Sequence, residues 1–239
     1  FTIWQFGTIA MIVMFTIFII DLYYGTFRSI LIFSEISLII TSSLIIFSII
    51  MVMINETGNK SIGSLDNATG MALVFELSSF FKQNPLNNFN IWFCQFSAEE
   101  IGTMGSRFFV DAHKDMLIKD NVYQINFDMV SCKEHSNEVE YVKSYGVFPK
   151  KESDPRIMSI LEGYEKEEDF KIKGHILLSG AHTDSVPFHQ LDIKAIDFTT
   201  PIAAKYSHSI MDTPDKVDID VISDTFIIVK NLMKKLDEK

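Results

Sequence analysis

Two long apolar runs near the start of the chain most constrain its fold. Residues 1–20 and 36–54 contain no charged side chain, and each run is long enough to cross the hydrocarbon core of a bilayer as a helix. The residues between them include Tyr23 and Arg28, which suit a membrane–water interface. The pattern predicts a two-helix transmembrane hairpin, and hence an integral membrane protein that contacts the lipid bilayer through residues 1–54.

Two alternatives to a membrane hairpin fit the sequence less well. A buried soluble hairpin would have to enclose two charge-free runs of this length. A secretory signal peptide would show a single run with a basic start and a small-residue cleavage site. The one arginine between the runs does not indicate on which side of the membrane the remaining chain lies.

The rest of the chain, residues 55–239, has a different composition. All but three of the 31 acidic and 21 basic side chains lie here. The excess of acid argues against a nucleic-acid partner, because the phosphates would be repelled. Residues 55–70 are rich in Gly, Asn and Ser, which is typical of a linker. We therefore expect a membrane domain at residues 1–54 and a second domain at residues 55–239.

Strands and helices are predicted to alternate along the second domain. Aromatic and β-branched runs between turn signals predict strands at residues 87–97, 122–130, 175–180 and 192–198. Apolar side chains at helical spacing predict helices near residues 68–83, 105–117, 154–169 and 214–239. This alternation indicates an α/β fold, a three-layer sandwich in which helices flank a mixed but mostly parallel sheet.

Acidic and histidine side chains lie at the ends of these elements, where α/β proteins bind their ligands. They are Asp66, Glu99, Glu100, Asp128 and His208. Asp66 alone could be a helix cap, but Asp128 interrupts a strand pattern, and a buried carboxylate is costly unless it is paired or metal-bound. Glu99 and Glu100 would point to opposite faces of a regular strand, so the backbone must turn there. Carboxylates with an imidazole form a donor set suited to Zn²⁺.

Four motifs, in order, resemble those of the zinc exopeptidases of metallopeptidase family 28, which include leucyl-type aminopeptidases. The motifs are GSLDNATGMALVFEL at 63–77, FSAEEIGTMGSRFFV at 96–110, INFDMVS at 125–131 and YSHSIMDTPDKVD at 206–218. The resemblance runs from about Gly63 to the C-terminus. It implies a zinc exopeptidase, most simply an aminopeptidase, that hydrolyses the N-terminal bonds of peptide substrates. Together with the hairpin predicted at residues 1–54, this indicates a membrane-tethered exopeptidase.

The resemblance also implies a role for each candidate residue. Two zinc ions would be bridged by Asp66, with Glu100 and His208 holding one ion and Asp128 the other. Glu99 would be the general base, which takes a proton from the activated water and later passes it to the leaving amine. Such a site needs several carboxylates to offset the charge of the metals.

One ligand of the family has no counterpart where it is expected. The family has a His-x-Asp motif before the bridging aspartate, but no histidine precedes His113. The motif could lie upstream of Phe1, in which case the domain lacks its N-terminal portion; the second zinc site could be incomplete; or His182-x-Asp184 could supply the ligand. Against the last explanation, the stretch with Asp184 and Phe188 resembles the family's substrate loop, which would place His182 near the mouth of the site.

Several further alternatives stay open. Asp212 could support the His208 loop by accepting a hydrogen bond, or it could cap a helix. The protein could be a catalytically inactive membrane protein that keeps the peptidase fold, or a glutaminyl-cyclase-like acyltransferase, which resembles this fold but uses one zinc ion. A carboxypeptidase is also possible, because the metal centre does not determine which peptide terminus is held. The sequence does not indicate an oligomeric state.

Overall fold

The chain divides into two compact units, Phe1–Gly58 and Asn59–Lys239. The computed structural model describes residues 13, 16, 39–40, 42–43, 46–47, 49–50, 60–119, 121–134, 137–146, 150–178 and 183–238. Most of the hairpin predicted at residues 1–54 lies outside these described residues, so it stays a prediction. Within the described part of the chain, no helix has both the length and the apolar character needed to span a bilayer.

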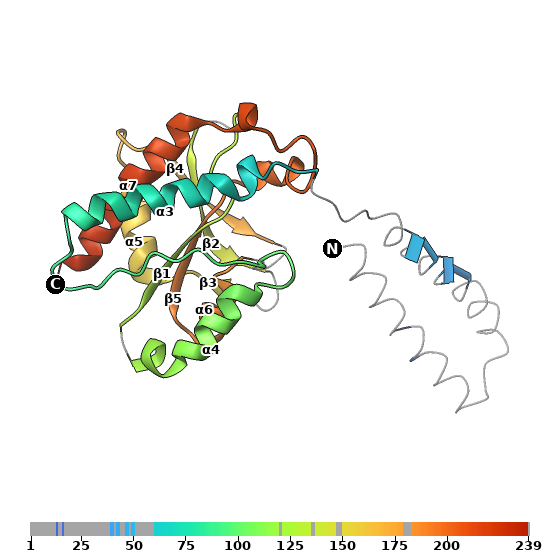
Figure 1. The fold of residues 1–239 in the computed structure, drawn as a ribbon, viewed down its shortest axis with the longest axis horizontal. Helices are drawn as coiled ribbons and strands as arrows, with labels where there is room; N and C mark the ends of the chain where they lie inside the picture. Colours follow the sequence, from blue (N-terminus) through green and yellow to red (C-terminus); the bar gives the residue numbers. More distant parts are fainter. Residues whose placement is uncertain are drawn as a thin grey trace. The chain divides into compact units, whose positions relative to one another are not determined.

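The second unit combines helices with strands, as Figure 1 shows. Its helical elements are η1 (Ser64–Ala68), α3 (Thr69–Gln83), α4 (Met104–Lys119), α5 (Pro155–Tyr164), α6 (Val186–Gln190), η2 (Pro201–Lys205), η3 (Pro214–Lys216) and α7 (Ile219–Asp237). Its strands are β1 (Tyr123–Phe127), β2 (Val139–Tyr145), β3 (Lys151–Glu152), β4 (Ile172–Leu177) and β5 (Lys194–Phe198).

Most of the predicted elements are confirmed. The four predicted helices correspond to α3, α4, α5 and α7, and three of the four predicted strands correspond to β1, β4 and β5. Two of these helices have an aspartate as their N-cap residue. Asp154 accepts backbone N–H bonds at the start of α5, and Asp218 does the same at the start of α7. The sequence pattern did not reveal β2, β3 or α6.

The strand predicted at residues 87–97 is wrong. No strand is present there, and residues 90–96 make no backbone–backbone hydrogen bond to any other described residue. A strand exists only where a neighbouring strand pairs with its backbone. Trp92 and Phe93 are 53% and 38% exposed, so the aromatic pattern of a strand is present without a pairing partner.

The sheet is mixed and mostly parallel, as predicted. Its order is β1-β5-β2-β3, and β4 also pairs with β2. The β1–β5 and β2–β4 pairs are parallel, whereas β2 runs antiparallel to β3 and to β5. The short connection between β2 and β3 accounts for one of the two antiparallel pairs, because a parallel pair needs a long crossover and an antiparallel pair does not.

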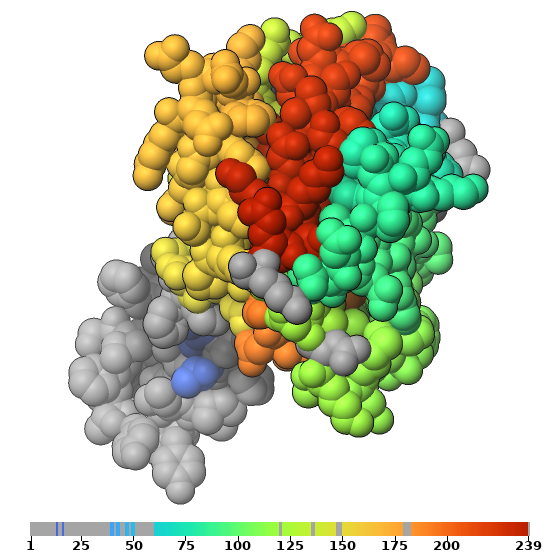
Figure 2. Space-filling model, turned by 90° about the vertical axis from the view of Figure 1, so that its left-hand side faces the viewer, coloured from blue at the N-terminus to red at the C-terminus, as the bar shows by residue number. Residues whose placement is uncertain are grey.

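Helices cover both faces of the sheet, as predicted for a three-layer α/β sandwich. Helices α3, α5 and α7 lie on one face and α4 and α6 on the other (Figure 1), and Figure 2 shows α7 between α3 and α5. Side chains of β5 divide between two apolar cores. Ile196 and Phe198 join the core under α3, α5 and α7, and Ala195 joins the core under α4 and α6, as the two-residue period of a strand requires.

A buried glutamate on β2 should make the stability of this unit pH-dependent. Glu140 is 7% exposed, and burial, aided by Glu138 and opposed by Lys173, raises its pKa from 4.5 to about 7. Because the pKa is higher in the folded state, the free energy of unfolding falls as the pH rises through this range. We expect Glu140→Gln to remove this pH dependence. The free energy of unfolding of the variant should exceed that of the wild type by roughly 2 kcal/mol at pH 8 and should differ little from it at pH 4.5. Urea unfolding at both pH values measures it, and an equal gain at both would contradict the assignment.

Candidate metal centre

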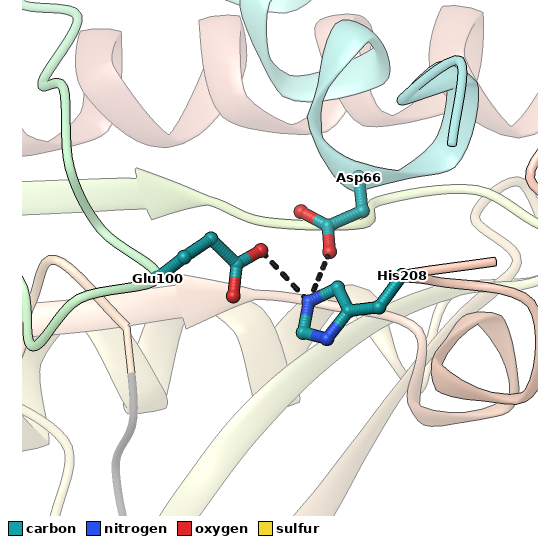
Figure 3. A group of neighbouring side chains, drawn as sticks. All are labelled: Asp66, Glu100 and His208. Carbon is teal, nitrogen blue, oxygen red and sulfur yellow. Dashed lines mark ion pairs between the residues drawn. The ribbon is translucent and has the colours of Figure 1, made fainter. Parts of the chain in front are cut away.

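Three side chains from distant parts of the sequence meet at one point (Figure 3). The Nε2 atom of His208 lies 3.1 Å from Oδ2 of Asp66 and 2.7 Å from Oε1 of Glu100. Each residue offers one ligand atom, and these atoms all lie within 4.8 Å of one another. Two carboxylate oxygens and an imidazole nitrogen form a donor set that fits Zn²⁺. We call Asp66, Glu100 and His208 the ligand cluster.

The turn that carries Asp66 is held in place by Asp212. The backbone N–H of Leu65 donates to Oδ1 of Asp212 at 2.6 Å, and the N–H of Asp66 donates to Oδ2 at 3.3 Å. Asp212 is completely buried and lies in the loop that follows His208. Its carboxylate therefore links the first turn of η1, which carries one ligand residue, to the loop that follows another.

Asn67, which the sequence analysis did not single out, ties the same turn to the end of β1. Its Nδ2 donates to the carbonyl of Phe127 at 2.8 Å, and its Oδ1 accepts from the N–H groups of Gly70 at 3.1 Å and Met129 at 3.3 Å. These bonds bracket Asp128 on both sides. Asn67 thereby holds Asp128 beside the ligand cluster, which is a reason for an amide directly after Asp66.

The close approach of α3 to the end of β1 depends on Gly70. A Cβ atom at this position would lie 2.5 Å from Oδ1 of Asn67 and 2.5 Å from the carbonyl oxygen of Phe127. We expect Gly70→Ala to lower the free energy of unfolding by about 1–3 kcal/mol, because the backbone must move to make room.

Gly163 offers a matched control for that substitution. It lies near the end of α5, with no heavy atom within 4 Å of an added Cβ. Gly163→Ala should be neutral or should stabilise the protein by up to about 1 kcal/mol, because alanine favours a helix. Urea unfolding of both variants measures the contrast, and similar values for the two would contradict the steric argument.

The backbone turns sharply at the two adjacent glutamates, as the sequence predicted. Gly102 and Thr103 donate backbone N–H bonds to the carbonyl of Glu99 at 3.0 and 2.7 Å, and α4 begins directly afterwards. Gly102 has a φ of +98°, a conformation that favours glycine. The turn allows Glu100 to reach His208 while the neighbouring Glu99 occupies a more buried position.

The carboxylates of the site raise one another's pKa values. Burial, followed by the charges of Glu100, Asp184 and Asp66, raises the pKa of Glu99 to about 7. Burial and the charge of Glu100 also raise the pKa of Asp66. An array of this kind favours a bound cation, because a positive charge relieves both the burial cost and the mutual repulsion.

Asp128 lies beside the ligand cluster without belonging to it. It follows β1 directly, and its backbone N–H donates to the carbonyl of Phe198 on β5 at 3.1 Å. Burial, together with the negative charges of Asp66 and Glu99, raises its pKa well above the ordinary value. Its carboxylate is thus within electrostatic reach of the cluster, on the side of β1.

The residues assigned to a substrate loop have three different outcomes. His182 lies outside the described residues, so its role as a ligand stays a prediction. Asp184 lies near enough to Glu99 for its charge to raise the pKa of that glutamate. Phe188 is buried in the apolar core with Val110 and Leu117, a structural position, and its contact with a substrate stays a prediction.

Asp197, a fully buried residue of β5, anchors the start of this loop. Its two oxygens accept hydrogen bonds from the hydroxyls of Thr183 at 2.7 Å and Ser185 at 2.6 Å. Tyr145 and Asn126 also donate to it. Asp184 is therefore held between two anchored neighbours. The sequence analysis did not single out Asp197, because it is one of three charged residues in the predicted strand at residues 192–198.

Comparison with known proteins agrees with the geometry of the site. The model of peptidase family M28 matches residues 51–233, which is more than half of the chain. The chain belongs to peptidase family M28. This M28 chain is 27% identical over 137 residues to aminopeptidase YwaD from Bacillus subtilis (strain 168), an alignment that covers 57% of this chain and 28% of YwaD.

Solved structures share the fold of this M28 chain. BSAP, a zinc aminopeptidase from Bacillus subtilis, has a TM-score of 0.61 and 21% identity, and the match covers 76% of this chain and 44% of BSAP. A glutaminyl cyclase from an Acidobacteriales bacterium has a TM-score of 0.55 and 17% identity, with 74% of this chain and 62% of the cyclase covered. The chain spans less than half the length of the aminopeptidases with which we compare it.

Proposed function

We propose that this M28 chain is a zinc-dependent exopeptidase, most directly an aminopeptidase that hydrolyses N-terminal peptide bonds. The observation that carries the proposal is the ligand cluster with Glu99 beside it, whose pKa is raised to about 7. A general base works best when its pKa lies near the operating pH. The relatives named as an aminopeptidase and a zinc aminopeptidase support the choice of peptide substrate and metal.

In this proposal each residue of the site has a distinct task. Zinc, when bound, would polarise the substrate carbonyl and make water more acidic. The ligand cluster would hold one ion, and Asp128 would join Asp66 in holding a second. Glu99 takes a proton from the attacking water and delivers it to the leaving amine. Asp184 adds negative charge close to Glu99, which favours a protonated amino terminus over a carboxylate in the site.

The second zinc position lacks an identified histidine ligand. Among the described residues, Asp66, Glu100 and His208 are the one set of three side chains close enough to share an ion. The three explanations for the missing His-x-Asp motif therefore stand: a motif upstream of Phe1, an incomplete second site, or a ligand from His182. Zinc content separates them: a ligand from His182 gives about two ions in residues 1–239, a motif upstream of Phe1 gives two only in a chain that includes that motif, and an incomplete second site gives one ion or none in either chain.

A membrane tether at residues 1–54 completes the proposal. It is supported by the two charge-free runs, each long enough to span a bilayer as a helix. Extraction of membranes with alkaline carbonate tests it, because a membrane-spanning chain stays in the pellet and a peripheral one is released. Release into the supernatant would remove this part of the proposal without affecting the peptidase.

The activity is tested on the full chain with three peptides, after removal of zinc with a chelator and again after zinc is restored. We expect zinc-dependent release of the first residue from a peptide with a free amino terminus, and no reaction with its N-acetylated form. Cleavage of the acetylated peptide from its other end would indicate a carboxypeptidase. No turnover after zinc is restored would indicate an inactive relative.

A glutaminyl-cyclase-like acyltransferase is the second candidate. The one cluster of three ligands among the described residues suits a single ion, and a glutaminyl cyclase shares the fold. A peptide with N-terminal glutamine distinguishes the two activities. Cyclisation with loss of ammonia and no released residue would support the acyltransferase, whereas release of free glutamine supports the aminopeptidase.

A further inference from the structure

Asp197 places a carboxylate at a completely buried position of β5, where an apolar side chain would be ordinary. A buried carboxylate costs free energy unless hydrogen bonds satisfy it. Here each oxygen accepts two of them: Oδ1 from Asn126 and Thr183, both at 2.7 Å, and Oδ2 from Tyr145 and Ser185. We call Asp197 and these four donors the Asp197 network. It joins β1, β2 and β5 to the loop that precedes α6.

Two donors of the Asp197 network flank Asp184 in this loop. Thr183 and Ser185 are both buried, and their hydroxyl oxygens lie 2.8 Å apart. The backbone N–H of Val186 donates to the carbonyl of Thr183 at 3.0 Å, and α6 begins at the same residue. Side-chain and backbone hydrogen bonds therefore fix the chain on both sides of Asp184.

The carboxylate of Asp184 has one oxygen without a donor. It lies beside Ser106, near the start of α4, and close to Glu99. Its Oδ1 atom is shielded from solvent and has no hydrogen-bond partner among the described residues. A buried acceptor without a donor costs about 1–3 kcal/mol. This open acceptor lies at the candidate site, where a bound molecule can supply the donor.

A protonated amine is the donor that fits this acceptor best. Glu99 and Asp197 both add negative charge around Asp184, so a cationic donor is favoured over a neutral one. A hydrogen bond between charged groups is also roughly twice as strong as one between neutral groups. In the substrate of an aminopeptidase, such an amine lies on the carbon next to the scissile carbonyl. It would therefore lie near Glu99 whenever that carbonyl is placed for attack.

We infer that Asp184 accepts a hydrogen bond from the α-ammonium group of the peptide substrate, and that Asp197 is the positioning residue that holds Asp184 in place for it. Asp197 is completely buried, so it acts through the loop and not by contact with the substrate. The inference rests on the proposed aminopeptidase function, because it takes that substrate as its ligand. It adds that the preference for a free amino terminus depends on a carboxylate inside the fold.

The test measures binding, not turnover, on the zinc-loaded full chain with two ligands that cannot be hydrolysed. One is a tripeptide in which a ketomethylene group replaces the first peptide bond, and the other is its desamino analogue, which lacks only the α-amine. Isothermal titration calorimetry gives both dissociation constants, and their ratio is the amine preference. We expect the wild type to bind the amine form about tenfold or more tightly, as one hydrogen bond to a charged group predicts. Asp184→Asn should lower the amine preference by about tenfold and Asp197→Asn by about threefold or more, with the affinity for the desamino ligand unchanged.

Thr183 allows the same link to be tested without a change of charge inside the fold. Thr183→Val removes one donor to Asp197 and should lower the amine preference by about threefold, whereas Thr183→Ser keeps the hydroxyl and should keep the preference. Thr225→Val is the matched control. Thr225 is also a buried threonine, but its hydroxyl donates to the carbonyl of Val221 within α7 at 2.7 Å, so its loss should leave the preference unchanged.

The amine preference separates a positioning role from a merely structural one. The inference is overturned if the wild type binds both ligands equally or neither, or if Asp184→Asn keeps the preference. It is also overturned if Asp197→Asn and Thr183→Val keep the preference, or if they weaken both ligands by the same factor. A wild-type protein that shows the preference but releases no residue from a peptide contradicts the proposed function and still supports this inference.

Discussion

Glu99→Gln is expected to lower kcat for peptide hydrolysis by about 10³-fold or more while the zinc content stays that of the wild type. Glutamine has the shape of glutamate but cannot accept the proton of the attacking water. The glutamate is suited to that step because burial and the charges of Glu100 and Asp184 bring its pKa to about 7. Initial rates and metal analysis on the same preparation measure both quantities.

Glu76→Gln provides the matched control for this experiment. Glu76 lies on the exposed side of α3, and the same chemical change there should leave the rate and the zinc content unaltered. A Glu99→Gln variant that keeps most of its activity would rule out Glu99 as the base. A variant that loses both its activity and its zinc would instead assign Glu99 to metal binding. Metal analysis distinguishes this outcome from the expected one, in which activity is lost and zinc is kept.

The sequence predicted the convergence at the metal centre because the motifs place charged side chains at the ends of elements. Asp66 precedes α3, Asp128 follows β1, and Glu100 precedes α4. In an α/β fold these ends meet at one edge of the sheet. The tertiary structure brings His208 to Asp66 and Glu100 from the other end of the unit, which local spacing alone could not determine.

The residues that support the site were harder to predict, because their roles depend on distances across the fold. Asn67 is uncharged, and nothing in its local sequence indicates that it bonds to the end of β1, 60 residues away. Asp197 similarly resembles an ordinary polar position of a strand until its four hydroxyl and amide donors are known. The strand predicted at residues 87–97 is wrong for the same reason. Whether a segment pairs with a neighbouring strand depends on the rest of the fold and not on the residues of the segment alone.

Asp66→Ala should produce the largest change in metal binding. Asp66 is a member of the ligand cluster and is also proposed to bridge to the ion beside Asp128, so its loss affects both positions. We expect zinc affinity to fall by more than about 100-fold, beyond the 10–100-fold typical of residues that only orient a ligand. Metal content after dialysis against a zinc buffer measures the loss. Asp215→Ala, which changes an exposed aspartate of η3, is the matched control and should keep its zinc.

Asp212→Asn separates a ligand from the residue that positions it. The amide of asparagine can accept only one of the two N–H bonds that Asp212 takes from Leu65 and Asp66, so the turn should loosen while all three ligand atoms remain. Zinc affinity should fall by about 10–100-fold, between the values for Asp66→Ala and Asp215→Ala. If Asp212→Asn removed as much zinc as Asp66→Ala, Asp212 would be a ligand rather than a support. If Asp66→Ala kept its zinc, the cluster in Figure 3 would not be a metal site.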